Sequence, residues 1–136
     1  AQLAPTAFVE GNRLFTEFKG ALTENYVLQT LLTQFEVMPR YWSQNNPPYE
    51  VDFLIQREND IFPIEVKSAD NTASRSLKKF KERFPDQVKL RIRFSLDNLK
   101  LDDDVLNIPL FMADHTDRLI GLALDTVKTP HAAAKI

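Results

Sequence analysis

Apolar side chains recur at helical spacing in the first third of the chain, and at every second position in its middle. Residues 14 to 35 contain good helix formers and no proline, so they predict a helix. Its apolar residues are Leu14, Phe15, Phe18, Leu22, Val27, Leu28, Leu31 and Leu32. Because they occupy more than one side, we expect this helix to be largely buried. Pro39 marks its end, and residues 40 to 43 predict a short strand.

Strict alternation follows in the middle of the chain. Residues 51–56 and 61–67 predict two strands joined by a short turn at 58–60. In the first strand, one face is expected to carry Val51, Phe53 and Ile55, and the other Asp52 and Leu54. In the second, the apolar residues share one face and leave Glu65 and Lys67 together on the other.

The remaining pattern adds further elements around the same sheet. It predicts a helix over 74–84, a strand over 88–95, a polar connection over 97–104, a strand over 106–112 and a short helix over 114–124. Within the connection, the run Asp102-Asp103-Asp104 is typical of a solvated turn. The order of elements predicts a mixed α/β domain with helices covering a small sheet. We expect an irregular lead-in at 1–13, one domain at 14–128 and a flexible tail at 129–136.

Length and composition agree with one globular domain. The chain has 136 residues, of which 43% are hydrophobic. Cysteine is absent, which excludes disulfides and thiol catalysis and fits a reducing compartment. No apolar run approaches the roughly 18 residues that would span a bilayer, and no signal-peptide pattern opens the chain. We therefore expect a cytoplasmic protein without a membrane partner. Because the sequence begins at Ala1, we also expect a piece of a longer chain.

A net charge of −2 conceals a strong asymmetry. Residues 71–93 carry eight basic and two acidic side chains, a local charge of +6, and the rest of the chain carries −8. Lysine and arginine in this stretch would give salt-sensitive contacts with nucleic-acid phosphates. The alternative is an ordinary solvated helix face and edge strand. The candidate nucleic-acid contacts are Arg75, Lys78, Lys79, Lys81 and Arg83.

Four residues could carry chemistry: Glu24, Asp52, Glu65 and Lys67. A short hairpin would place Asp52 beside Glu65, and Lys67 leaves the same face two residues further along. Two carboxylates and a lysine suit Mg²⁺-dependent phosphodiester cleavage, since Mg²⁺ takes carboxylate oxygens and keeps sites for water and phosphate. Glu24 falls within an apolar stripe of its helix, where a carboxylate needs compensation. Two alternatives stay open: the Glu65-x-Lys67 pair as a surface salt bridge, and a helix rotated so that Glu24 reaches solvent.

Several segments carry a resemblance to known proteins. They are Phe18–Asn25, Tyr41–Ser43, Glu50–Leu54, Pro63–Ser68, Ser76–Phe80 and Leu106–Leu110. Together they resemble the C-terminal domain of a family of predicted prokaryotic AAA-type ATPases. Asp52 followed by Glu65-x-Lys67 resembles the PD-(D/E)xK signature of the restriction-endonuclease-like superfamily. The resemblance implies a three-layer α/β/α nuclease-like domain attached behind an ATPase module. The chain itself contains no P-loop.

The resemblance also implies a role for each residue of the site. Asp52, Glu65 and the Val66 carbonyl would hold Mg²⁺ or Mn²⁺, and Glu24 would be a further ligand or hold a bound water. Lys67 would orient the attacking water or stabilise charge. The implied function is Mg²⁺-dependent hydrolysis of DNA. Two alternatives are a catalytically silent module that binds DNA or protein for the attached ATPase, and a metal site that serves regulation.

Overall fold

The computed structural model describes residues 5–43, 49–68 and 75–128. The helices are α1 (Pro5–Leu32), α2 (Arg75–Arg83), the 3₁₀ helix η1 (Leu110–His115) and α3 (Thr116–Lys128). The strands are β1 (Glu36–Ser43), β2 (Tyr49–Arg57), β3 (Asp60–Val66), β4 (Arg91–Ser95), β5 (Lys100–Asp102) and β6 (Val105–Pro109). The prediction of a mixed α/β domain is confirmed.

All six strands form one sheet, in the order β1-β2-β3-β4-β6-β5. The first three form an antiparallel meander. β3, β4 and β6 are parallel, and β5 returns antiparallel along β6. The carboxyl ends of the three parallel strands therefore meet at one edge of the sheet, where open α/β sheets commonly bind ligands.

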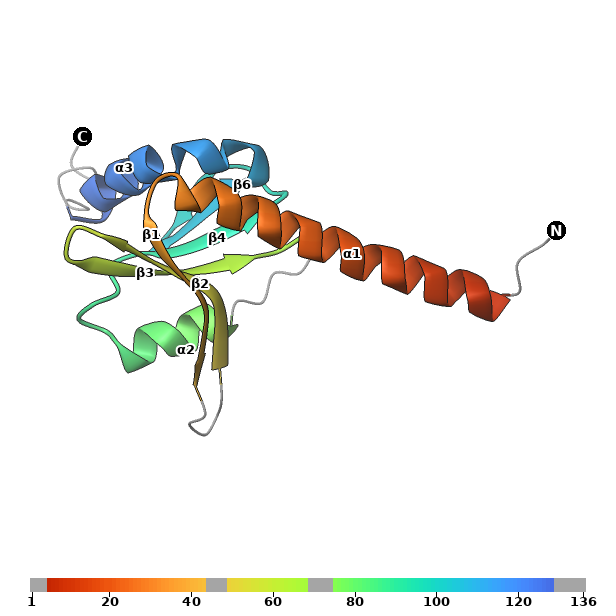
Figure 1. Cartoon of the computed structure of the whole chain (residues 1–136). Helices are drawn as coiled ribbons and strands as arrows, with labels where there is room; N and C mark the ends of the chain where they lie inside the picture. The colour runs from red at the N-terminus through yellow and green to blue at the C-terminus, as the bar shows by residue number, and fades with distance from the viewer. Residues whose placement is uncertain (1–4, 44–48, 69–74, 129–136) are drawn as a thin grey trace.

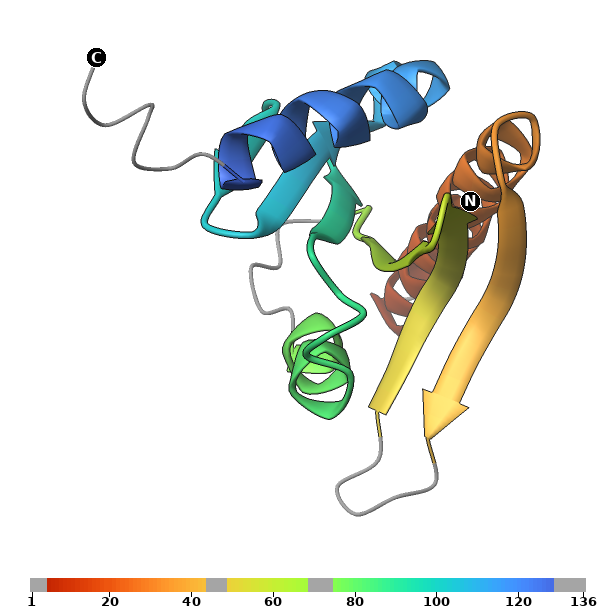
Figure 2. The same cartoon turned by 90° about the vertical axis from the view of Figure 1, so that its left-hand side faces the viewer.

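Helices lie on both faces of this sheet (Figures 1 and 2). One face packs on α1, η1 and α3 and buries the larger core, which includes Phe53, Ile64 and Phe94. The opposite face packs on α2, where a smaller cluster includes Leu54, Leu77 and Phe80. The narrow apolar stripe predicted for α2 accounts for this second contact, because Leu77 and Phe80 are its buried residues.

The first helix differs most from the prediction. It begins at Pro5, so the irregular lead-in predicted for residues 5–13 is wrong. The expectation of a largely buried helix is also wrong, because Phe18 is 62% exposed and Leu22 54%. Figure 1 gives the reason: α1 runs well past the sheet, and only its later turns cover it. Val27 and Leu31 are the residues of these turns that enter the core.

Smaller differences concern boundaries. Pro39 does not precede a strand but lies inside β1, an edge strand, where its missing N–H is tolerated. The polar connection contains β5, and the last predicted strand ends at Pro109 and continues as η1. The predicted tail lies outside the described residues. No helix in the described part of the chain is long and apolar enough to cross a membrane.

Candidate functional site

The hydrogen-bonded ladders of the sheet are interrupted at Asp52. Along β1 and β2 the paired positions run without a gap except opposite Asp52, where Arg40 is skipped. Between β2 and β3 the pairing ends at Phe53 and Ile64, one residue before Asp52 and Glu65 would meet. β2 is therefore paired with β3 only from Phe53 onward, whereas its pairing with β1 continues in the same register on both sides of Asp52.

A change of face accompanies the interruption. Phe53 packs in the large core, whereas Val51 and its partner Tyr41 pack in the smaller cluster under α2. The prediction that Val51 shares a face with Phe53 is therefore wrong. Arg40, at the skipped position, has a φ of 53°. This left-handed backbone is uncommon outside glycine and gives the strand its local twist.

The Asp52 side chain takes the place of the missing ladder bond. Its Oδ2 accepts a hydrogen bond of 2.8 Å from the Val66 N–H, at the carboxyl end of β3. In an extended strand, the N–H and C=O of one residue point to the same side. The Val66 carbonyl is thus directed toward β2 as well, on the side where the Asp52 carboxylate lies.

Glu65 and Lys67 complete the cluster at the same strand end. Lys67 Nζ lies 3.2 Å from Glu65 Oε1, and their side chains are only 24% and 12% exposed. The other carboxylate oxygen, Glu65 Oε2, is buried and has no hydrogen-bond partner among the described residues. A buried carboxylate oxygen without a partner is costly, so this position favours a cation or a donor that binds from outside the chain.

Glu24 reaches the cluster from α1. It is half-buried and lines a small cleft of about 230 Å³ together with Leu28, Arg40 and Phe53. Four residues earlier, a Cβ added to Gly20 would lie 3.5 Å from Ser68 Oγ, so this turn of α1 passes close to the end of β3. Glu24 therefore lines this cleft and remains partly exposed to solvent.

Electrostatics link the four side chains. Burial raises the pKa of Asp52 from 3.8 to about 6. The Val66 hydrogen bond opposes this rise, the negative charges of Glu24 and Glu65 add to it, and Lys67 opposes it weakly. The charges of Glu24, Glu65 and Lys67 thus all act on Asp52. That these four side chains form one site stays a prediction.

The residues around Asp52 meet some of the requirements of a divalent-cation site, but not all of them. The described residues contain no group of three or more histidine, aspartate or glutamate side chains arranged to hold a metal ion. Two carboxylates and one backbone carbonyl do converge, however, and Mg²⁺ usually takes only one or two protein carboxylates and keeps several waters. The unpartnered Glu65 Oε2 would be available as an oxygen ligand for such an ion.

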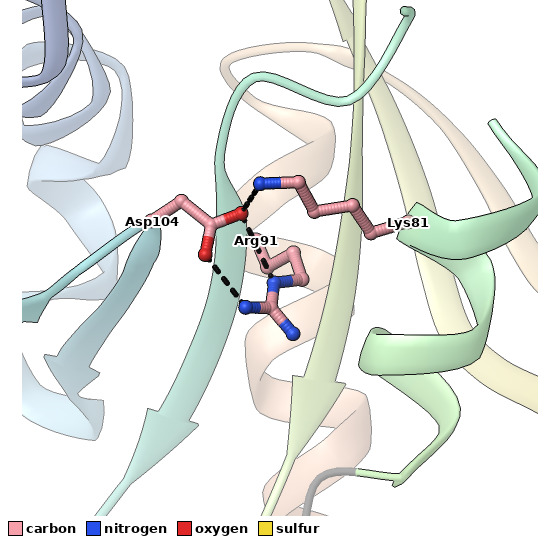
Figure 3. A network of polar contacts seen from close by, with 3 residues as sticks. All are labelled: Lys81, Arg91 and Asp104. Carbon is pink, nitrogen blue, oxygen red and sulfur yellow. Dashed lines mark hydrogen bonds and ion pairs between the residues drawn. The ribbon is translucent and has the colours of Figure 1, made fainter. Parts of the chain in front are cut away.

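Some cations of the basic stretch form ion pairs within the protein, so fewer of them can contact nucleic acid than the local charge suggests. Asp104, only 4% exposed, accepts a hydrogen bond of 2.6 Å from Arg91 Nη2 and a short one from Lys81 Nζ (Figure 3). Burial raises the pKa of Asp104, but these hydrogen bonds outweigh it, so the net shift is downward. Asp103 and Asp104 do form a turn, and Asp102 and Asp103 are exposed, but the prediction of a solvated side chain is wrong for Asp104. The Asp-Asp-Asp run itself does not indicate that its last residue, just before β6, is buried.

The other cations are distributed over α2, β4 and the connection between them. Lys89 Nζ lies 3.1 Å from Asp60 Oδ1. Arg75, Lys78 and Arg83 are exposed and Lys79 is half-buried. Lys81 thus contributes first to attaching α2 to the sheet. The remaining four candidates form a modest basic surface on α2.

A family model matches residues 19–111, which include all four side chains of the cluster. The chain belongs to the family described as a domain of unknown function, DUF4143. No functionally curated protein shows significant sequence similarity to it.

Solved structures provide a comparison of the fold. One similar chain comes from a refined half-complex of the tetradecameric assembly of Thermococcus gammatolerans McrB AAA+ hexamers with bound McrC. It is 13% identical with a TM-score of 0.52, over 79% of this DUF4143 chain and 33% of that chain. A protein of unknown function, AF1548, is 19% identical with a TM-score of 0.38, over 74% and 55% of the two chains. This second likeness is too weak to support an argument.

Proposed function

We propose that this DUF4143 chain is a restriction-endonuclease-like domain whose cluster at the carboxyl end of β3 hydrolyses phosphodiester bonds in DNA with Mg²⁺ or Mn²⁺. One observation carries the proposal. Asp52, Glu65 and Lys67 lie where the pairing of β2 with β3 ends, and one buried oxygen of Glu65 has no hydrogen-bond partner among the described residues. That donor set matches the two carboxylates and the lysine of the PD-(D/E)xK signature.

Each side chain has a distinct task in this proposal. Asp52 and Glu65, with the Val66 carbonyl, would hold the ion, and Glu24 would hold a water or complete the ligand set. When bound, the ion would lower the pKa of a coordinated water and stabilise negative charge on the phosphate. Lys67 already lies against Glu65, and its ammonium group can donate hydrogen bonds to the attacking water or to a phosphate oxygen.

The similarity to a chain from an assembly of AAA+ hexamers supports a second part of the proposal. We place this domain in a longer protein that contains an ATPase module, which would move or position the nucleic acid. The present chain spans only 33% of that similar chain, so a larger protein is a natural context.

A cleavage assay tests the activity. The full-length protein is incubated with plasmid DNA and Mg²⁺ or Mn²⁺, alongside Asp52→Ala and Lys67→Ala. Asp114→Ala, which removes an exposed carboxylate outside the cluster, is the matched control. We expect the first two substitutions to reduce the rate by about a hundredfold or more, and the control to leave it unchanged. Cleavage that persists in both variants would identify a contaminant and refute the assignment.

One observation favours a second candidate function. The described residues provide no set of three acidic or histidine side chains for a metal, and Lys67 already compensates one oxygen of Glu65. These facts suit a catalytically silent module that binds DNA or protein for the ATPase. A wild-type protein that binds DNA but leaves it intact with both metals would favour this candidate.

A further inference from the structure

Basic side chains gather on the outer face of α2, away from the sheet. The buried residues Leu77 and Phe80 define the face of this helix that packs on the sheet. The basic residues on the outer face are Arg75, Lys78, Lys79 and Arg83. Lys79 is half-buried and the other three are exposed. Because Glu82 is the one acidic residue of the helix, the outer face has a charge of +3.

The four cations of this outer face differ in their partners from other basic residues of the stretch 71–93. Lys81 and Arg91 are bound to Asp104, and Lys89 Nζ lies 3.1 Å from Asp60 Oδ1. Within the part of the chain that the structure describes, no acidic side chain forms an ion pair with the four cations of the outer face. Their charge is therefore available to an external anion.

The crossover from β3 to β4 places the start of α2 at the edge of the sheet where the cluster lies. β3 and β4 are parallel, so the chain leaves β3 at its carboxyl end, and α2 runs back toward the start of β4 (Figure 1). Ile64 and Val66 pack in or against the large core. Alternation therefore directs Glu65 and Lys67 to the opposite face, which α2 covers. The first turn of α2 and the Glu65–Lys67 pair thus share one face and one edge of the sheet.

The length of α2 matches a short run of phosphates. Its nine residues extend over about 12 Å, at a rise of about 1.5 Å per residue. Along the axis of a DNA duplex, successive phosphates of one strand are about 3.4 Å apart. A strand that follows the outer face of α2 therefore brings about three phosphates within reach of its cations.

We infer that the outer face of α2 binds the sugar-phosphate backbone of DNA next to the bond that the Asp52–Glu65 cluster cleaves. The inference rests on the proposed function and specifies what holds its substrate. Charge complementarity supports this partner, because a face of +3 without internal ion pairs attracts a polyanion. Lysine and arginine side chains that contact phosphates position a nucleic acid but carry no sequence information. Binding by this face is therefore independent of base sequence.

The test measures binding without cleavage. Full-length protein is titrated into two fluorescein-labelled DNA duplexes of unrelated sequence, in EDTA at salt from about 50 to 200 mM. Two variants of the outer face are Arg75→Gln and the double variant Lys78→Gln/Lys79→Gln. The matched control is Arg118→Gln, which removes the same charge from an exposed position on α3. Glutamine has about the helix propensity of lysine and arginine, so α2 should remain folded.

The salt dependence gives the expected size of the effect. Loss of one phosphate contact reduces the slope of log K against log salt by about 1. We expect a reduction of about 1 in Arg75→Gln, about 2 in the double variant and none in Arg118→Gln. At about 0.1 M salt, Arg75→Gln should weaken binding about five- to tenfold, by the same factor for both duplexes.

A further variant separates loss of a contact from loss of the fold. Glu82→Gln removes the exposed acidic side chain of α2 and should bind both duplexes several-fold more tightly than the wild type. An unchanged slope in Lys78→Gln/Lys79→Gln would overturn the inference, and so would a wild-type protein that binds neither duplex. Binding of heparin without binding of DNA would assign the surface to another polyanion and would also overturn it.

Failure here can be told apart from failure of the proposed function. DNA cleavage that depends on Asp52, combined with affinity that is indifferent to the cations of α2, would leave the nuclease proposal intact and refute this surface. Binding that depends on those cations, without cleavage under either metal, would support the surface and refute the hydrolytic role.

Discussion

Two aspartates of this protein, the buried Asp104 and the half-buried Asp52, have opposite electrostatic environments. Asp104 is paired with Arg91 and Lys81, and its pKa is lowered (Figure 3). Asp52 has one backbone donor and lies near two further carboxylates, and its pKa is raised to about 6. A carboxylate compensated within the chain stabilises the fold. A carboxylate whose charge is not fully compensated by neighbouring groups of the protein is typical of a ligand-binding or catalytic site.

The largest effect should follow from breaking the compensated network. Asp104→Ala would leave two basic side chains, Arg91 and Lys81, without their shared carboxylate. Loss of one partner from a buried ion pair costs about 3 kcal/mol or more. Urea denaturation should show a decrease of this size in the free energy of unfolding. Asp103→Asn, an exposed neighbour with a φ of 56° that asparagine tolerates, should change it by less than about 0.5 kcal/mol.

An unaffected Asp104→Ala variant would show that the network contributes little to the attachment of α2. It would also remove the contrast between the two aspartates.

The second effect concerns pH and has the opposite sign to ordinary acid denaturation. Because the pKa of Asp52 is raised, the folded protein binds this proton more tightly than the unfolded chain does. Its contribution to stability is full below about pH 4 and is lost as the pH rises through about 6.

Asp52→Asn removes that contribution and serves as the reference. Without metal, the variant should be more stable than the wild type at pH 8, by about 1–2 kcal/mol after allowance for solvent screening. The difference should shrink toward pH 4. Urea denaturation at a series of pH values measures it, and a difference that is independent of pH would contradict the raised pKa.

The smallest effect should come from Glu24. Its negative charge adds to the raised pKa of Asp52, although less than burial does. Glu24→Gln should therefore lower the pKa of Asp52 by a fraction of a unit, as measured by NMR titration of the aspartate carboxyl carbons. Glu17→Gln, an exposed position two turns earlier on α1, is the control and should leave that pKa where it is.

Most of this difference between Asp52 and Asp104 could not be predicted from the sequence. The alternation in β2 and β3 predicts that Asp52, Glu65 and Lys67 lie close to one another. A short hairpin leaves little freedom in how its two strands pair, so the sequence spacing fixes which residues are neighbours. Asp104 could not be recognised, since its partners come from α2 and β4, 23 and 13 residues away. Local pattern records spacing along the chain and not the tertiary contacts that bury a charge.

The irregularity of β2 at Asp52 could not be predicted from the sequence either. Regular alternation predicts one face for Val51 and Phe53, whereas Phe53 packs in the large core and Val51 in the smaller cluster, on either side of the skipped Arg40–Asp52 pair. Similarly, the apolar side chains of α1 predict burial, but no sheet lies beneath its first turns (Figure 1). Both differences arise from the arrangement of elements, which periodicity does not encode.

We propose that the Asp52–Glu65 pair binds a divalent cation. Mn²⁺ titration monitored by electron paramagnetic resonance tests this most directly, with wild type, Asp52→Asn, Glu65→Gln and the surface control Asp114→Asn. We predict one bound Mn²⁺ in the wild type and in the control, displaced by Mg²⁺, and at least a tenfold loss of affinity in either cluster variant. Equal Mn²⁺ binding by all four proteins, or none by the wild type, would contradict the account.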